Sequence, residues 1–303
     1  MTTDLITGAF GYTGSAIAER LLERGRSVRT LTRRPAAGHP LAERVEAVLL
    51  RFGDRDSLAA AFAGVDTFYN TYWRRFGRPR VGFDDIVDES TQLIEAARAA
   101  GVRRLVQFSV SNASHDAPTA YFRAKASVER IALGSGISTV VVRPTLLFGP
   151  GDILVNNLAW TLRHVPVFAI PGDGAYRVQP VLVGDVADLA IRVADGEAVA
   201  TVDAAGPETF RFGDLVRLLR DRIRAPARLV RVPPWFALFG AKVAGSLVGD
   251  VVLTRDEVTE LMGSLLVSRR PPMCPTPFST WLDEHADSVG RRYASELARN
   301  CRL

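Results

Sequence analysis

Short apolar runs and amphipathic stretches alternate along the first half of the chain, and this alternation constrains the fold more than any other feature of the sequence. Each apolar run suits one buried strand, and each amphipathic stretch repeats apolar residues at the spacing of one helical face. Neighbouring parallel strands need a long crossover connection, usually a helix. The alternation therefore predicts an α/β fold with a parallel sheet that is covered by helices.

The predicted elements of this half follow one another without an internal repeat or a low-complexity segment. The apolar runs predict strands at residues 5–7, 28–32, 45–50, 65–70, 104–109 and 139–143. The amphipathic stretches predict helices at residues 13–23, 57–63, 84–100 and 119–133.

The composition of the sequence changes after Pro144, where prolines and glycines become frequent and the predicted elements become shorter. Apolar spacing predicts helices at residues 186–194 and 214–223, and a capping box of Thr254 and Glu257 predicts the start of another. We expect these elements to form a smaller C-terminal α/β lobe.

Two domains therefore divide the chain in our interpretation. Residues 1–150 form the core domain, and residues 151–303 form most of the smaller lobe, with some segments returning to the core. No linker separates the two, so we expect them to fold together.

The most apolar window of the chain covers residues 232–253. Lys242 and Asp250 interrupt it, as do several glycines and prolines, so we expect no membrane-spanning helix. A buried or surface-docked amphipathic helix is the favoured interpretation, and contact with a membrane surface is the alternative.

The charge balance is basic, with a net charge of +5 and a pI of 9.6, but the arginines are scattered along the chain. The densest basic group is the segment 74–80, which is interleaved with Trp73 and Phe76. We interpret this segment as a solvated loop, and binding of an acidic ligand is the alternative. No recognition helix is evident, so we expect no nucleic-acid partner.

Cysteine and histidine are rare, and their positions lack the spacing of a metal site. The chain contains only Cys274 and Cys301, and four histidines. We therefore predict no metal, and a reducing cytoplasmic location, which the absence of a secretory-signal pattern at the first residues also favours.

Glycines Gly8, Gly11 and Gly14 lie between the first predicted strand and the first predicted helix. A glycine run at this place lets the backbone turn tightly and approach a pyrophosphate, which the N–H groups and positive dipole of the helix then bind. The sequence thus predicts a Rossmann-type doubly wound sheet that binds a dinucleotide.

The end of the second predicted strand indicates which dinucleotide is bound. NAD-binding Rossmann proteins carry an acidic residue there for the ribose 2′-hydroxyl, whereas this strand ends in Thr32-Arg33-Arg34. A guanidinium suits a 2′-phosphate, so we predict that Arg33 selects NADP(H) over NAD(H).

These motifs resemble those of the short-chain dehydrogenases/reductases in their atypical or extended branch. The chain is similar to the NmrA-like group and to the Rossmann accessory subunit of respiratory complex I. The resemblance covers nearly the whole chain and rests on the turn at 8–14, Gly53-Asp54, Arg143-Pro144 and the segments 148–152, 179–181 and 185–187. It implies that Asp54 contacts the adenine of the cofactor.

Tyr121 and Lys125 fit the Y-x-x-x-K pattern of these enzymes. Positions i and i+4 share one helical face, so the phenol and the ammonium group can act on one substrate. A nearby cation favours the ionised form of tyrosine, so Tyr121 can serve as a general acid whose proton affinity Lys125 adjusts.

Ser109 is the third predicted catalytic residue, because it ends the fifth predicted strand 12 residues before Tyr121. Ser111 and Ser114 are the alternatives. The serine or threonine of sugar-nucleotide epimerases and dehydratases lies about twice as far ahead of the tyrosine, so the spacing separates this chain from them. The asparagine that the family often has on the preceding helix is not obvious here, where Ser90, Thr91 and Gln92 occur.

The predicted cofactor contacts are Gly8, Phe10, Gly11, Tyr12, Thr13, Gly14, Arg33, Asp54, Asn70, Lys125 and Pro144. The aromatic side chains expected in a partly apolar substrate pocket are Tyr72, Trp73, Phe148 and Trp160.

The favoured function is an NADPH-dependent reductase that transfers hydride to a carbonyl- or quinone-like small molecule. The alternative is a sensor or scaffold protein of the NmrA-like type that binds NADP(H) without turnover. A homodimer is the default expectation for the oligomeric state.

Overall fold

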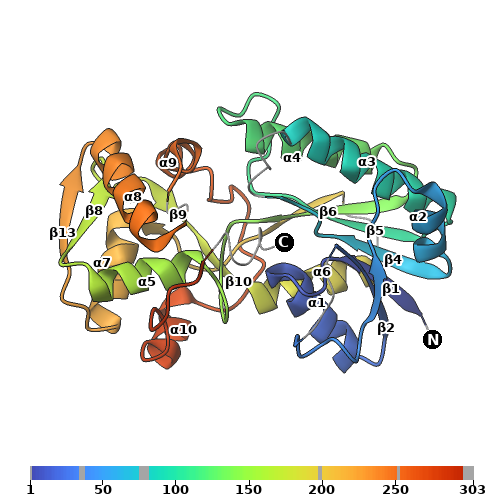
Figure 1. The fold of residues 1–303 in the computed structure, drawn as a ribbon, viewed down its shortest axis with the longest axis horizontal. Coiled ribbons are helices and arrows are strands. Elements are labelled where there is room, and N and C mark those ends of the chain that lie inside the picture. Colours follow the sequence, from blue (N-terminus) through green and yellow to red (C-terminus); the bar gives the residue numbers. More distant parts are fainter. Residues whose placement is uncertain (1, 34–37, 75–81, 197–199, 251–252, 296–303) are drawn as a thin grey trace. The chain divides into compact units, whose positions relative to one another are not determined.

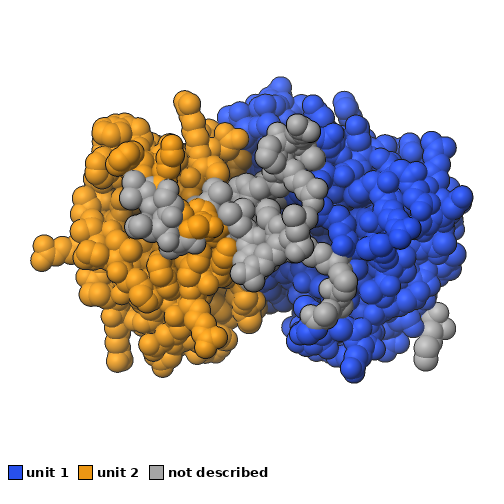
Figure 2. Space-filling model, in the orientation of Figure 1, with its two compact units in different colours: residues 1–144, 183–204 blue, residues 145–182, 205–303 orange. Residues whose placement is uncertain are grey.

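The computed structural model describes residues 2–33, 38–74, 82–196, 200–250 and 253–295. The chain forms two compact units (Figure 2). Unit 1 consists of Met1–Pro144 together with Val183–Ala204, and unit 2 consists of Thr145–Leu182 together with Ala205–Leu303. Each unit is therefore built from two separate stretches of the chain.

Unit 1 contains a seven-stranded sheet in the order β11-β6-β5-β4-β1-β2-β3, in which every pair of neighbours is parallel. The strands are β1 (Thr3–Thr7), β2 (Ser27–Thr32), β3 (Glu46–Leu49), β4 (Val65–Asn70), β5 (Arg104–Phe108), β6 (Ser138–Pro144) and β11 (Thr201–Ala204). The strand order reverses direction at β1, so the prediction of a doubly wound Rossmann-type sheet is confirmed. Strand β11 is an addition to the predicted set.

Helices cover both faces of this sheet (Figure 1). They are α1 (Tyr12–Glu23), α2 (Arg55–Phe62), α3 (Phe83–Ala99), α4 (Ala120–Leu133) and α6 (Val183–Asp195). Helix α1 packs against α6, whereas α3 packs against α2 and α4 on the opposite face. Strand β5 is buried at all five positions because both of its faces are covered.

The described residues of unit 2 form shorter elements and three two-stranded sheets, β10-β7, β12-β9 and β13-β8. Its strands are β7 (Leu146–Phe148), β8 (Val167–Pro171), β9 (Arg177–Val178), β10 (Pro180–Leu182), β12 (Phe210–Arg211) and β13 (Arg228–Val232). Its helices are α5 (Leu154–His164), α7 (Phe212–Arg222), α8 (Pro234–Val248), α9 (Arg255–Met262) and α10 (Phe278–His285).

The core of unit 2 contains an aromatic cluster, and this corrects one expectation. Phe148 is fully buried, and its ring lies 5.0 Å from that of Phe278 and 5.1 Å from that of Trp281. The expectation that Phe148 lines a substrate pocket is therefore wrong, because its ring is enclosed by core side chains.

Over the described residues, no helix is both long and apolar enough to cross a bilayer.

Candidate active site

The glycine turn after β1 has the backbone conformation that its sequence predicts. Gly8 has a φ of +73°, which is in the left-handed region, and its N–H donates to the carbonyl of Leu31 at 3.0 Å. A Cβ atom on Gly14 would lie 2.1 Å from the carbonyl oxygen of Gly8. Glycine is therefore required at both positions for the first turn of α1 to pack against the loop.

The N-terminus of α1 points a positive dipole end toward this turn. Gly11 is its N-cap and has an extended backbone, and the described first turn has neither a capping side chain nor an acidic residue. The turn and the helix end together form a cradle that a Cβ would fill, and they fit the pyrophosphate of a dinucleotide. Phe10, Tyr12 and Thr13 belong to the same turn.

Asn70 joins the ends of three strands of unit 1. Its Oδ1 accepts a hydrogen bond from the hydroxyl of Thr7 at 3.1 Å, and its Nδ2 donates to Oε1 of Gln107 at 2.8 Å. Its side chain is completely buried. Asn70 thus fixes the strand ends beside the glycine turn, and its contact with a cofactor stays a prediction.

Arg33 directly follows β2, and its side chain is exposed. Among the described residues, its guanidinium has no carboxylate partner, so it is available for a phosphate. Arg34 lies outside the described residues. Asp54 acts as the N-cap of α2 and accepts a hydrogen bond from the N–H of Ser57 at 3.0 Å, which gives it a local structural role.

Lys125 is buried on α4, with only 5% of its surface exposed. Its ammonium group lies 3.9 Å from the centre of the Trp73 ring and donates to the carbonyl of Phe108 at 3.4 Å. Burial lowers the pKa of Lys125 to about 7, because the loss of water disfavours the charged form and outweighs the opposing attraction of Glu129.

The carboxylate of Glu129 is bound by another residue. Glu129 lies one turn after Lys125 on α4 and forms an ion pair with Arg143 on β6, in which Nε donates to Oε1 at 2.8 Å. Arg143 precedes Pro144, the last residue of β6. The ion pair therefore fixes α4 to the strand that ends in Pro144.

Tyr121 is half-buried one turn before Lys125, and the centre of its ring lies 6.0 Å from the ammonium group. The ring of Trp73 meets it edge-on, with the centroids 5.3 Å apart and the planes at 83°. Trp73 thus contacts both members of the predicted pair. The sequence suggested Trp73 only as a pocket lining, and no sequence signal links it to Lys125.

Ser109 follows β5 and is 8% exposed. Its backbone N–H donates to Val142 at 2.9 Å, and its buried hydroxyl has no hydrogen-bond partner among the described residues. A buried hydroxyl without a partner is uncommon and suits a position that receives a ligand oxygen. The alternative, Ser111, is completely buried, and its backbone N–H donates to the carbonyl of Pro144 at 2.9 Å.

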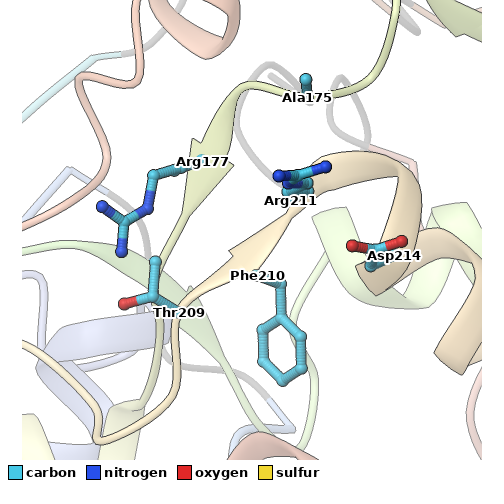
Figure 3. Close-up of a pocket in the computed structure, with 6 residues that line it drawn as sticks. All are labelled: Ala175, Arg177, Thr209, Phe210, Arg211 and Asp214. Atoms are coloured by element: carbon cyan, nitrogen blue, oxygen red, sulfur yellow. The ribbon is translucent and has the colours of Figure 1, made fainter.

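Unit 2 contains an open polar cavity of about 570 Å³ (Figure 3). It is lined by Ala175, Arg177, Thr209, Phe210, Arg211 and Asp214. Arg177 and Arg211 are register partners on β9 and β12, and the ring of Phe210 is turned away from both guanidinium groups (Figure 3). The predicted catalytic and cofactor residues are not part of this lining.

The doubly wound sheet, the glycine cradle and the tyrosine–lysine pair on α4 define a Rossmann-fold protein of the extended short-chain dehydrogenase/reductase type. The chain belongs to the NAD-dependent epimerase/dehydratase family, whose model matches residues 5–203. It is therefore an NAD(P)-dependent oxidoreductase of this type, and the predicted resemblance is confirmed.

Two curated relatives cover most of the chain. One is the (4-alkanoyl-5-oxo-2,5-dihydrofuran-3-yl)methyl phosphate reductase of Streptomyces griseus, which is 30% identical over 94% of this chain and 98% of the relative. The other is the mitochondrial NADH dehydrogenase (ubiquinone) 1 alpha subcomplex subunit 9 of Arabidopsis thaliana, which is 26% identical over 87% of this chain and 70% of the relative.

Solved structures share the fold as well. The NADPH-dependent quinone oxidoreductase QOR2 of Escherichia coli, solved with NADPH, matches with a TM-score of 0.74 and 20% identity. The match covers 93% of this chain and 99% of that structure. At this identity the likeness establishes the fold alone.

Proposed function

We propose that this protein is an NADPH-dependent reductase that acts on a carbonyl- or quinone-like small molecule. The observation that carries the proposal is the burial of Lys125 one helical turn from Tyr121, beneath the ring of Trp73. Burial of a cation without a paired carboxylate is energetically costly, and lysines with a perturbed pKa cluster at functional sites.

In the reaction we propose, Tyr121 donates its phenolic proton to the substrate oxygen. NADPH, held at the glycine turn Gly8–Gly14, would supply the hydride for the carbon of the same carbonyl group. Lys125 stabilises the tyrosinate that remains, and a proton from solvent restores the phenol. The hydroxyl of Ser109 donates a hydrogen bond to the substrate oxygen, which uses the donor that has no partner within the described protein.

The cofactor preference rests on Arg33. Its exposed guanidinium directly after β2 suits the 2′-phosphate of NADPH, which NADH lacks. We expect Arg33→Ala to weaken NADPH binding by about tenfold or more, since hydrogen bonds to charged groups contribute about 1.5–3 kcal/mol. NADH binding should change less than twofold by the same titration, and an equal loss for both cofactors would contradict the assignment.

The test of the reaction follows NADPH consumption with a panel of quinones, ketones and aldehydes. We expect turnover with at least one substrate class, and a loss of about 100-fold or more in Tyr121→Phe while NADPH still binds. Tyr293→Phe is the matched control, because Tyr293 lies in unit 2 and its hydroxyl donates to Asp250 at 2.9 Å. Unchanged turnover in Tyr121→Phe would remove Tyr121 from the mechanism.

The similarity to a complex I subunit favours a second candidate, a protein that binds NADP(H) as a sensor or scaffold without turnover. NADPH binding with no consumption across the panel would support this candidate over the reductase. The cytoplasmic location, the homodimer and the partly apolar substrate pocket stay predictions.

A further inference from the structure

The first turns of helix α8 expose three aromatic side chains to solvent. Trp235, Phe236 and Phe239 are 68%, 48% and 62% exposed, whereas Ala237 is 6% exposed and Gly245 is buried. A helix that faces water normally does the opposite, with its apolar stripe toward the core. Within the part of the chain that the structure describes, the exposed aromatic face of α8 is therefore an apolar surface without a partner.

Two strands next to α8 in unit 2 also carry exposed apolar side chains. Helix α8 packs against β8, which pairs in parallel with β13 (Figure 1). Val167 on β8 is 49% exposed, and Val230 on β13 is 42% exposed. We call the exposed aromatics of α8 together with these two valines the α8 surface.

The charged residues of the segment that contains β13 and α8 have one sign. Residues 222–249 contain four arginines and one lysine and not a single aspartate or glutamate. Arg222 forms an ion pair with Asp283, but the exposed Arg228 and Arg231 have no carboxylate partner among the described residues. An apolar surface with such cations on the same segment of the chain complements a partner that is apolar inside and anionic at its surface.

We propose that the α8 surface docks onto a phospholipid bilayer that contains anionic lipids, with α8 lying in the plane of the interface. Tryptophan and phenylalanine on one face together with arginine and lysine at the margin are typical of interfacial helices. The 15 residues of α8 span about 22 Å at 1.5 Å each, which is less than the about 30 Å of a hydrocarbon core. The helix therefore lies on the membrane and does not cross it.

A folded protein partner complements this surface less well. A protein that covered the α8 surface would have to supply carboxylates for Arg228 and Arg231 and a dry apolar patch for the aromatics. A second copy of this chain would bring the same cations to the contact, and like charges in juxtaposition oppose association. The bilayer proposal is independent of the reductase activity proposed above.

The test is co-sedimentation of the full chain with phosphatidylcholine vesicles, with and without phosphatidylglycerol. We expect binding to the mixed vesicles that weakens with salt, and much weaker binding to phosphatidylcholine alone. Trp235→Ser/Phe236→Ser/Phe239→Ser should lose binding by more than about tenfold. Arg228→Gln/Arg231→Gln should lose about 25-fold on mixed vesicles, from about fivefold for each cation.

Matched controls distinguish docking through the α8 surface from nonspecific adsorption to vesicles. Leu49→Ser removes a residue that is 48% exposed on β3, and Arg55→Gln/Arg98→Gln removes two exposed cations of unit 1. Both should bind vesicles as the wild type does, and circular dichroism should report a native fold for every variant. Binding that is absent in the wild type, or equal in the wild type and the α8 variants, would overturn the proposal. A concentration-dependent dimer in light scattering that the triple variant abolishes would overturn it as well, by assigning the face to a second copy.

Discussion

The same kinds of side chain occur in two regions of this molecule in opposite environments. On α4, Lys125 is buried under Trp73 and beside Tyr121. On α8, Lys242 is exposed on the helix that carries the exposed rings of Trp235 and its aromatic neighbours. These are the two lysines of the chain, which otherwise uses arginine for its cations.

The contrast shows that residue type alone does not determine what a lysine does. Burial removes water from Lys125 and lowers its pKa to about 7, so its charge responds to what binds beside it. The long, thin side chain of lysine can be buried with its ammonium group against a ring, and arginine could not lose its proton there. On α8 it is the aromatic side chains that are exposed, so they contact whatever surrounds the protein.

The largest expected difference between the two regions is in turnover. We expect Lys125→Met to lower the turnover of a substrate from the panel by about 100-fold or more, because Tyr121 then loses the cation that stabilises its ionised form. Lys242→Met should instead weaken binding to anionic vesicles by about fivefold. Equal losses of turnover in both variants would contradict the separation of roles.

The next largest expected effect is on the pH dependence of stability, which Lys125→Met should change. The unfolded chain holds a proton on Lys125 up to about pH 10.4, whereas the folded chain releases it near pH 7. Between these values the unfolded state binds more protons, so the free energy of unfolding of the wild type should rise with pH relative to Lys125→Met. From pH 7.5 to 9.5 we expect a relative gain of about 2 kcal/mol in urea titrations without cofactor, and a flat difference would contradict the burial of Lys125.

The two tryptophans should differ in their effect on folding. Trp73→Leu removes half-buried ring surface that covers Lys125, and we expect it to cost about 1–2 kcal/mol of unfolding free energy. Water would then reach the ammonium group, so the pKa of Lys125 should rise toward its ordinary value. Trp235→Leu lies on an exposed face and should stay within about 0.5 kcal/mol of the wild type. A larger cost for Trp235→Leu would reverse the comparison.

The smallest expected effect tests the helices themselves. Helix α4 contains no glycine, whereas α8 contains Gly240 and Gly245. A Cβ on Gly240 would meet nothing within 4 Å, so Gly240→Ala should stabilise the protein by about 0.5–1 kcal/mol. Thermal unfolding measures this gain, and a loss of stability would mean that the exposed face of α8 is in contact with something.

The sequence predicts unit 1 well because its signals are local. Apolar runs bounded by glycine, and helices with one apolar face, identify six of its seven strands, and the turn at Gly8 and Gly14 follows from backbone geometry alone. Strand β11 escaped prediction because Thr201–Ala204 is short and pairs only with β6 at the edge of the sheet.

Unit 2 and the surroundings of Lys125 depend on contacts between distant residues. Strands β9 and β12 have two residues each, which is too short for any periodic pattern. Phe148 looked like a pocket residue because nothing in its own segment predicts the rings of α10 that enclose it. Trp73 follows β4, and Lys125 lies on the helix that follows β5. The two residues come into contact because β4 and β5 are neighbours in the sheet, and the order of residues along the chain does not reveal this neighbourhood.

The return of the chain to unit 1 has a consequence for biosynthesis. Helix α6, which packs against α1, and strand β11, which pairs with β6, are made only after the whole stretch Thr145–Leu182 has been synthesised. A nascent chain that ends at Pro144 therefore has an uncovered helix and an open sheet edge, which are the features that invite aggregation. A ribosome must add some 60 further residues before this sheet is complete, so truncated products should need a chaperone more than the finished protein does.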